Sequence, residues 1–371
     1  MVGLSNSSLS PLRLPVGVRE EDILHGWDSN TLDPRITVIC HTYNHREYIA
    51  DAIESVLAQR TECAFELIIH DDASMDGTTD IVRKYEKRFP KLVRAIVQSE
   101  NQYSQGVKPP KFTYPRIKGE FVAFCDGDDF WLDELKLARQ MQALRRNSSV
   151  NLCVHKGYEI NVQRGTVSVH CDHGEKEYSF DSDTVVRAHS QLFPTASLMM
   201  RHAVIADLPA WFTEEKYRPY GDYFLRVYAS LNGAIYLPKI MSAYRRGVVG
   251  SYTDRMANRR SHDLLIDFKR TIYFNRKLIG VEGVSSKAIE ERLAHIRYEY
   301  VSRAFALGDY RLFRLASSDL FVSMRSKLGI AILVAGFGKS PFKLASKLYQ
   351  RRQFKHDCAV WIRKRCGNKI G

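Results

Sequence analysis

The first third of the chain alternates short apolar runs with segments in which apolar residues recur at helical spacing. Continuous apolar runs are typical of strands buried on both faces, and strands that alternate with helices indicate a parallel α/β sheet. Asn44 and Asp76 precede the two helical segments as candidate caps. The strands are predicted at 36–40, 65–70, 92–98 and 119–125, and the helices at 49–57 and 78–89.

Beyond residue 130 the pattern is more mixed, and no internal repeat is visible. Residues 131–146 have an amphipathic pattern that predicts a helix, and residues 222–231 predict another. We expect strands at 151–155 and 165–170, a strand, a turn and a strand within 234–244, and mostly helix from about Met256.

These patterns divide the chain into three regions. Residues 1–33 are rich in Ser, Pro and Asn without periodicity, which predicts a loose N-terminal extension. Residues 34–254 form the globular α/β part, and residues 255–371 form a helical region. The length of 371 residues suits two domains, or one large domain with an appendage.

Charge separates the last two regions. The formal net charge is +13, yet residues 255–371 hold 25 basic and 9 acidic side chains, so the first 254 residues are mildly acidic. Apolar residues make up 44% of the chain, enough for a core, which excludes wholesale disorder. A strongly basic region predicts an acidic partner surface, either a membrane or a nucleic acid.

The chain has seven cysteines without paired spacing. Neither a disulfide framework nor a structural zinc site is therefore expected, and a reducing compartment suits the sequence. The N-terminus lacks the apolar centre of a signal peptide, and the longest apolar run, 328–337, is shorter than the roughly 20 residues of a membrane-spanning helix. We expect a cytoplasmic protein.

Two acidic clusters each follow a predicted strand. Asp71 and Asp72 come directly after 65–70, and Asp126, Asp128 and Asp129 come directly after 119–125. Ligands of open α/β sheets bind outside the carboxyl ends of the strands. Crowded carboxylates repel one another unless a cation neutralises them, and hard oxygen ligands suit Mg²⁺ or Mn²⁺. Each cluster alone could be an acidic turn or a helix cap, but two in succession at strand ends favour a ligand site.

The loop after the first strand, CHTYNHREY, is not a phosphate-binding glycine loop. The sequence has neither GxxxxGK[ST] nor a GxGxxG after this strand. Tyr43 in this loop could stack on a nucleobase, because bases stack on aromatic faces, or could simply pack in the interior.

Three segments together resemble the family 2 glycosyltransferases, which have the GT-A fold. The resemblance spans about Ile36 to Ser251 and implies a nucleotide-binding half, 34–130, and an acceptor half, 131–254. It rests on ITVICHTYNHREYIADAIESVLAQ, FELIIHDDASMDGTTDIV and GEFVAFCDGDDFWLDELKLARQM, and continues in FPTASLMMR and YGDYFLRVYASLNGAIYLPKIMSAYRRG.

The resemblance implies how the donor is bound. Asp72 would hold the uracil or a related base, and Tyr43 would stack on that base with His41 and Thr42 in the same loop. A nucleotide-diphosphate sugar, with a UDP-sugar as the first expectation, is therefore the implied donor.

The resemblance also implies the chemistry. Asp126-Gly127-Asp128 would be the DxD motif, with Asp126 and Asp128 at the nucleotide sugar and Asp128 and Asp129 at a Mn²⁺ or Mg²⁺ ion. Asp222 would be the general base that deprotonates the acceptor hydroxyl, in a single inverting displacement. From the residues alone, Asp222 is better explained as a carboxylate that caps or stabilises the start of a helix, and both roles can hold together.

One departure from the family lies near Tyr244. Relatives often have a His shortly after the Tyr-Arg pair, whereas this chain has Gly247 near that place. Arg245 or Arg246 is the expected substitute as electrostatic partner of the leaving diphosphate.

The sequence therefore predicts a metal-dependent inverting glycosyltransferase of the hexosyltransferase type, in bacterial surface polysaccharide synthesis with a glycan or lipid-linked acceptor. The alternatives are a sugar nucleotidyltransferase, which would normally carry a Gly-rich basic loop after the first strand, and a catalytically degenerate nucleotide-binding relative, which would have lost an acidic residue.

The basic region ends in a segment, 325–371, with 12 basic residues and one acidic residue interleaved with apolar ones. This pattern predicts peripheral association with an anionic membrane surface. Packing of the segment on the catalytic domain is the alternative, and a nucleic-acid partner is not expected because no recognised motif is present.

Overall fold

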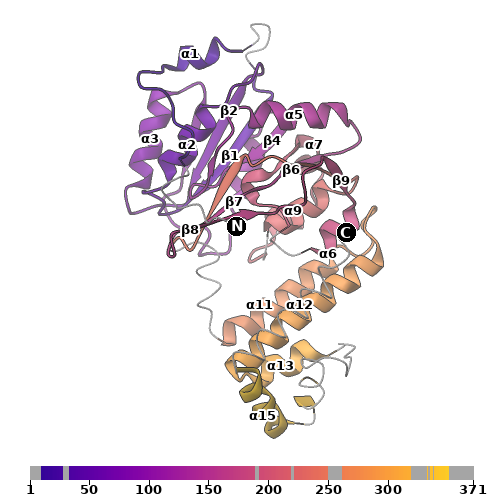
Figure 1. The fold of residues 1–371 in the computed structure, drawn as a ribbon. Helices are drawn as coiled ribbons and strands as arrows, with labels where there is room; N and C mark the ends of the chain where they lie inside the picture. Colours follow the sequence, from indigo (N-terminus) through magenta and orange to yellow (C-terminus); the bar gives the residue numbers. More distant parts are fainter. Residues whose placement is uncertain are drawn as a thin grey trace. The chain divides into compact units, whose positions relative to one another are not determined.

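The computed structural model describes residues 10–27, 33–188, 192–218, 221–249, 261–318, 332, 335–336 and 338–350. The chain divides into two compact units (Figure 1). The first unit comprises Met1–Val185 and Ser190–Met256, and the second comprises Val186–His189 and Ala257–Gly371. The predicted membrane segment 325–371 lies largely outside the described residues.

Two sheets organise the described part of the first unit. The larger has eight strands in the order β3-β2-β1-β4-β10-β6-β11-β9, of which β3, β2, β1 and β4 run parallel while β10 and β9 are antiparallel to their neighbours. These strands are β1 Ile36–Thr42, β2 Phe65–Asp71, β3 Val93–Val97, β4 Phe121–Phe124, β6 Leu152–His155, β9 Tyr178–Phe180, β10 Met199–Arg201 and β11 Ala234–Leu237. The smaller sheet has the order β5-β12-β7-β8, with β5 Phe130–Trp131, β7 Gly157–Asn161, β8 Thr166–His170 and β12 Ser242–Arg246.

One face of the larger sheet packs on three amphipathic helices. Successive strand residues point to opposite faces, so Ile36, Val38 and Cys40 of β1 join the same apolar core as these helices. The cysteines of the described chain are free thiols, and those in this core behave as small apolar side chains. The helices are α2 Ile49–Leu57, α3 Thr78–Arg88 and α5 Lys136–Arg146.

Shorter helical segments follow in the first unit, and the second unit is helical where it is described. Phe305, Phe313 and Phe342 lie at the centre of the second unit's own core. None of the described helices is both long enough and apolar enough to cross a membrane. The remaining helices are α4 Pro110–Thr113, η2 Tyr114–Arg116, α6 Ser182–Arg187, η3 Thr195–Ser197, α7 His202–Ala206, α8 Trp211–Glu214, α9 Gly221–Ala229, α11 Ser261–Arg276, α12 Ser286–Leu307, α13 Tyr310–Ser317 and α15 Lys339–Gln350.

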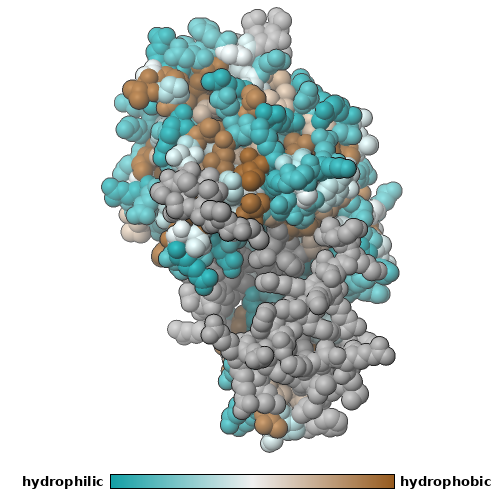
Figure 2. Space-filling model, viewed as in Figure 1, coloured by the Kyte–Doolittle hydropathy of each residue, from teal (hydrophilic) through white to brown (hydrophobic). Residues whose placement is uncertain are grey.

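Where the residues are described, the surface in view in Figure 2 is mostly hydrophilic, with apolar side chains in small groups between polar ones. Large apolar side chains with high exposure come from distant parts of the chain, such as Val16, Met75 and Val249. Isolated exposed apolar residues of this kind are normal for a globular protein.

Several local predictions need correction. The helix predicted over 131–146 begins at Lys136, because Phe130 and Trp131 pair with β12 instead. Strand β7 was not predicted. Asn44 caps no helix: it has a φ of 55°, and its side-chain oxygen accepts the N–H of Met75. Asp76 lies one residue before the N-cap position of α3, yet its carboxylate accepts the N–H of Thr78.

The prediction of a loose N-terminal extension is wrong for residues 10–27. Leu12 donates its N–H to the carbonyl of Trp131, and Arg13 forms ion pairs with Asp51 and Glu54. Helix α1, Glu20–Leu24, is apolar on one side and packs on the core beside α3 and β2. The composition suggested a loose chain because the few apolar residues that dock it show no periodicity.

Glu20 provides a test of this docking. Its carboxylate is buried and accepts the backbone N–H groups of Lys91 and Leu92 at 2.6 and 3.1 Å. Glu20→Ala would leave both donors without that acceptor, so we expect about 1–3 kcal/mol lower free energy of unfolding by urea titration. Glu21→Ala, an exposed position on the same helix, is the matched control. Equal stability of the two variants would show that the segment is not docked in solution.

Candidate active site

A pocket of about 440 Å³ opens at the carboxyl ends of β1, β2 and β4 in the first unit. This is the edge at which open α/β sheets bind ligands, and the volume suits a small organic ligand. It brings together the residues predicted to bind the nucleotide sugar or a metal ion and the predicted base, but Arg245 does not line it. Its lining includes His41, Thr42, Tyr43, His45, Asp72, Tyr114, Asp126, Asp128, Asp129, Glu159, His170, Arg218, Gly221, Asp222, Tyr244 and Arg246.

The loops after β1 and β2 are locked to each other, which fixes one wall of the pocket. The N–H of Asn44 donates to the hydroxyl of Ser74 at 2.8 Å, and the N–H of His45 donates to the hydroxyl of Thr78 at 2.9 Å. Asn44 and Ala73 both adopt the left-handed backbone that is uncommon outside glycine. These bonds hold the His41–Tyr43 loop beside the loop that carries Asp72.

Asp72 is buried, and both of its carboxylate oxygens are already engaged. They accept the N–H groups of Gln102 and Tyr103 at 2.9 and 3.0 Å. The side-chain amide of Asn101 donates to the carbonyl of Asp72 at 3.2 Å. Asp72 therefore positions the 101–103 loop at the pocket, and any contact with a nucleobase would use its remaining lone pairs.

The acidic loop after β4 packs against the first loop through Gly127. A Cβ atom on Gly127 would lie 2.5 Å from the Thr42 hydroxyl and 3.0 Å from the His45 ring, so only glycine allows this approach. Gly127 thus makes room for other side chains of the protein. The contact brings His45 Nε2 to 3.8 Å from the Asp128 carboxylate.

The surroundings of the Asp126 carboxyl group disfavour its charged form. Burial, reinforced by the neighbouring carboxylates of Asp128 and Asp222, raises the pKa of Asp126 to about 7. His41 lies 3.8 Å away, but burial lowers the pKa of His41 to about 3, so its ring is neutral and does not compensate that charge. A cationic ligand is the natural partner of such a group.

The Asp129 carboxylate contacts β12. Its carboxylate is buried and accepts the N–H of Arg245 at 3.0 Å. Burial and the neighbouring carboxylates raise the pKa of Asp129 well above its usual value. The predicted metal contact of Asp129 is untested, and because one of its oxygens is committed to a backbone N–H, Asp126 and Asp128 are the better candidates for binding a metal ion.

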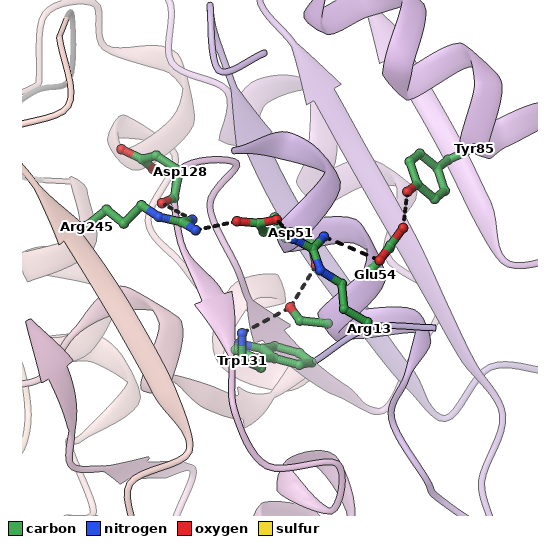
Figure 3. Close-up of polar contacts among 9 residues, drawn as sticks. Arg13, Asp51, Glu54, Tyr85, Asp128, Trp131 and Arg245 are labelled. Atoms are coloured by element: carbon green, nitrogen blue, oxygen red, sulfur yellow. Dashed lines mark hydrogen bonds and ion pairs between the residues drawn. The ribbon is translucent and has the colours of Figure 1, made fainter. Parts of the chain in front are cut away.

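The Arg245 side chain supports the acidic loop and does not line the pocket. Its guanidinium donates to the backbone carbonyl of Asp128 at 3.0 Å and pairs with Asp51 of α2, which also pairs with Arg13 (Figure 3). The aromatic rings of Tyr48 and Phe130 lie within 4.9 Å of its central carbon. Arg246, not Arg245, therefore faces the pocket.

Asp222 lies in the first turn of α9 and is about one-third exposed in the pocket. One carboxylate oxygen accepts a hydrogen bond of 2.9 Å from Arg226, one turn later on the helix. Arg226 also donates to the carbonyl of Phe193, which fixes the pair in place. The other oxygen is the one available for a substrate.

Some pocket residues were not predicted from the sequence. His45 lies in the segment CHTYNHREY, but the sequence pattern gave it no role. Its spacing from His41 was the only signal that could have pointed to the pocket. Two further pocket residues come from segments with no motif. They are His170 on β8, which lies 3.8 Å from Glu159, and Arg218 before α9. Among the described residues, no group of three or more His, Cys, Asp or Glu side chains forms a ready-made metal cage.

Comparisons with known proteins agree with this architecture. Residues 37–208 match the model of Glycosyl transferase family 2. The uncharacterized protein Rv1520 of Mycobacterium tuberculosis is 32% identical over 234 residues, which cover 59% of this chain and 62% of that protein. The poly(ribitol-phosphate) beta-N-acetylglucosaminyltransferase TarS of Staphylococcus aureus is 36% identical over 99 residues, 26% of this chain and 16% of TarS. The chain thus spans less than two-thirds of the length of these curated relatives.

A solved structure extends the likeness over more of the chain. TarS residues 1–349 in complex with UDP-GlcNAc align with a TM-score of 0.59 and 17% identity, over 85% of this chain and 92% of that one. At this identity the likeness shows the fold, and the GT-A prediction is confirmed.

The variant Arg245→Met tests whether Arg245 supports the acidic loop. Methionine keeps most of the apolar length but leaves the Asp128 carbonyl and Asp51 without this donor, so we expect about 3–5 kcal/mol lower stability and weaker UDP binding with Mn²⁺. Tyr85→Phe, which removes only the hydrogen bond to Glu54 at the far end of the network in Figure 3, is the control. Calorimetric titration and chemical unfolding of both variants measure the two effects. Unchanged UDP affinity in Arg245→Met would contradict the positioning role.

Proposed function

We propose that this chain, whose residues 37–208 match the model of Glycosyl transferase family 2, transfers a sugar from a nucleotide-diphosphate sugar to an acceptor hydroxyl with inversion. One observation carries the proposal. Asp126 and Asp128 from the end of β4 and Asp222 from the start of α9 line the same pocket as the loops of Tyr43 and Asp72. The carboxylates that would bind a cation and the carboxylate that would act as the base therefore line one pocket.

Asp222 supports the displacement as the general base. Its oxygen that is not bound to Arg226 would accept the proton of the acceptor hydroxyl as that hydroxyl oxygen attacks the anomeric carbon. The bond between the anomeric carbon and the diphosphate oxygen breaks in the same step, and the electron pair leaves with the nucleoside diphosphate. Attack from the face opposite the leaving group inverts the configuration.

The leaving diphosphate needs positive charge. Arg246 of β12 lines the pocket and is half-exposed, with Glu159 at 3.4 Å. Asp126 and Asp128 suit a Mg²⁺ or Mn²⁺ ion that takes its other ligands from the diphosphate and water, because such ions are usually held by one or two carboxylates plus phosphates. When bound, the ion would neutralise charge on the leaving group.

The donor and acceptor are proposed by class. The UDP-GlcNAc bound to TarS supports a UDP-sugar as donor, and the poly(ribitol-phosphate) in the name of TarS supports a polymer as acceptor. A surface polysaccharide or lipid-linked glycan is the acceptor class that we propose. Tyr43 beside Asp72 in the pocket supports base binding at that end.

A cytoplasmic enzyme that associates peripherally with the inner face of the membrane is consistent with this role. The support is the composition of residues 325–371, with 12 basic residues and one acidic residue.

A donor screen tests the function. With Mn²⁺ and a mixture of glycan acceptors, a UDP-sugar or another nucleotide-diphosphate sugar should release nucleoside diphosphate, EDTA should abolish the release, and added Mn²⁺ should restore it. Release of pyrophosphate from a nucleoside triphosphate would instead support a nucleotidyltransferase. Nucleotide binding without any turnover would support a degenerate relative.

Two variants show which carboxylate of the acidic loop binds the metal ion. Asp128→Asn should lose the Mn²⁺-dependent part of UDP affinity, whereas Asp129→Asn keeps an oxygen for the Arg245 N–H and should retain most of it. Equal loss in both variants would assign Asp129 to the metal as well.

Asp222→Asn tests the base. The amide can still accept from Arg226 but cannot take the acceptor's proton, so acceptor-dependent turnover should fall by about 10²–10⁴-fold with UDP affinity nearly unchanged. Asp207→Asn is a control, because Asp207 is exposed and does not line the pocket. If Asp222→Asn keeps near-normal turnover, Asp222 is not the base, and Glu214 and Glu215 would be tested next.

A further inference from the structure

Arg218 is a cation that the reaction outlined above does not use. It lines the pocket, and the residue as a whole is 1% exposed. Its Nη1 is buried and has no hydrogen-bond partner among the described residues. A buried donor without an acceptor is costly, above all in a charged group, and therefore needs an explanation.

The surrounding residues hold this guanidinium in place. Its Nε donates to the carbonyl of Phe212 at 2.8 Å, and its central carbon lies 3.8 Å from the centre of the Phe212 ring. Glycine at 221 leaves room for it, because a Cβ atom there would lie 2.5 Å from Nη1. The pKa of Arg218 is lowered by burial only to about 10, so the group stays charged at neutral pH.

The two arginines that line the pocket have different neighbours. Arg246 pairs with Glu159 of β7 at 3.4 Å. Arg218 contacts Gly221, the residue before Asp222, and thus lies next to the proposed base of the acceptor hydroxyl. The proposed function assigns Arg246 to the leaving diphosphate, which leaves Arg218 for another group.

We propose that Arg218 is a specificity-determining residue that binds a carboxylate or phosphate group carried by the substrate beside the reacting hydroxyl. The inference rests on the proposed function, because it assumes that Asp222 marks the acceptor hydroxyl. A guanidinium presents several N–H donors in a planar fork that matches such anions, which distinguishes an anionic substrate from a neutral one. The anion belongs either to the transferred sugar or to the acceptor.

Two binding experiments on the full chain with Mn²⁺ separate these sources. The donor arm compares UDP-glucuronate with UDP-glucose. The acceptor arm, with UDP present, compares glycerol 3-phosphate and glucuronate with glycerol and glucose. In one arm the anionic probe should bind about tenfold or more tightly than its neutral counterpart, the effect expected of one charge-assisted hydrogen bond.

Arg218→Gln should abolish that preference while UDP affinity stays within about twofold of the wild type. Gly221→Ala is a second variant that keeps the charge but displaces Nη1, and it should weaken the same preference. The absence of any preference in the wild type, or a preference that survives in both variants, would overturn the inference while the proposed function stands. Failure of the wild type to bind any nucleoside diphosphate with Mn²⁺ would overturn both.

Discussion

The interactions of Arg245 are the constraint on which the pocket depends. A buried guanidinium is costly unless its donors are satisfied and its charge is matched. Arg245 satisfies this requirement with the carbonyl of Asp128 and the carboxylate of Asp51, while its N–H binds Asp129. Three elements distant in sequence, α2, the acidic loop and β12, are thus held in one arrangement.

The network reaches beyond the sheet. Asp51 also pairs with Arg13, and Arg13 pairs with Glu54, whose carboxylate accepts from the hydroxyl of Tyr85 on α3. The N-terminal segment therefore belongs to the support of the acidic loop. Supporting contacts of this kind hold ligand-binding groups in the geometry that their chemistry requires.

The lining of the pocket carries more carboxylate groups than cationic ones. Burial, and after it repulsion from the carboxylates of Asp128 and Asp222, raises the pKa of Asp126. Arg246 and Arg218 each contribute a cation to the lining. This distribution suits a ligand that brings its own metal ion together with its negative charge, as a nucleotide-diphosphate sugar with Mg²⁺ or Mn²⁺ does.

The sequence by itself determined the parallel strands, the helices between them and the acidic residues at the strand ends, because apolar periodicity and local spacing encode these features. It did not reveal the docking of Glu20, the division of roles between Arg245 and Arg246, or the placement of Arg218 beside Gly221. Only the tertiary structure decided these, because each depends on which side chains from distant segments meet in a buried space. A charged side chain that is solvated in one fold can be buried in another, where it supports a loop or binds a ligand. The local sequence does not encode whether the side chain is buried.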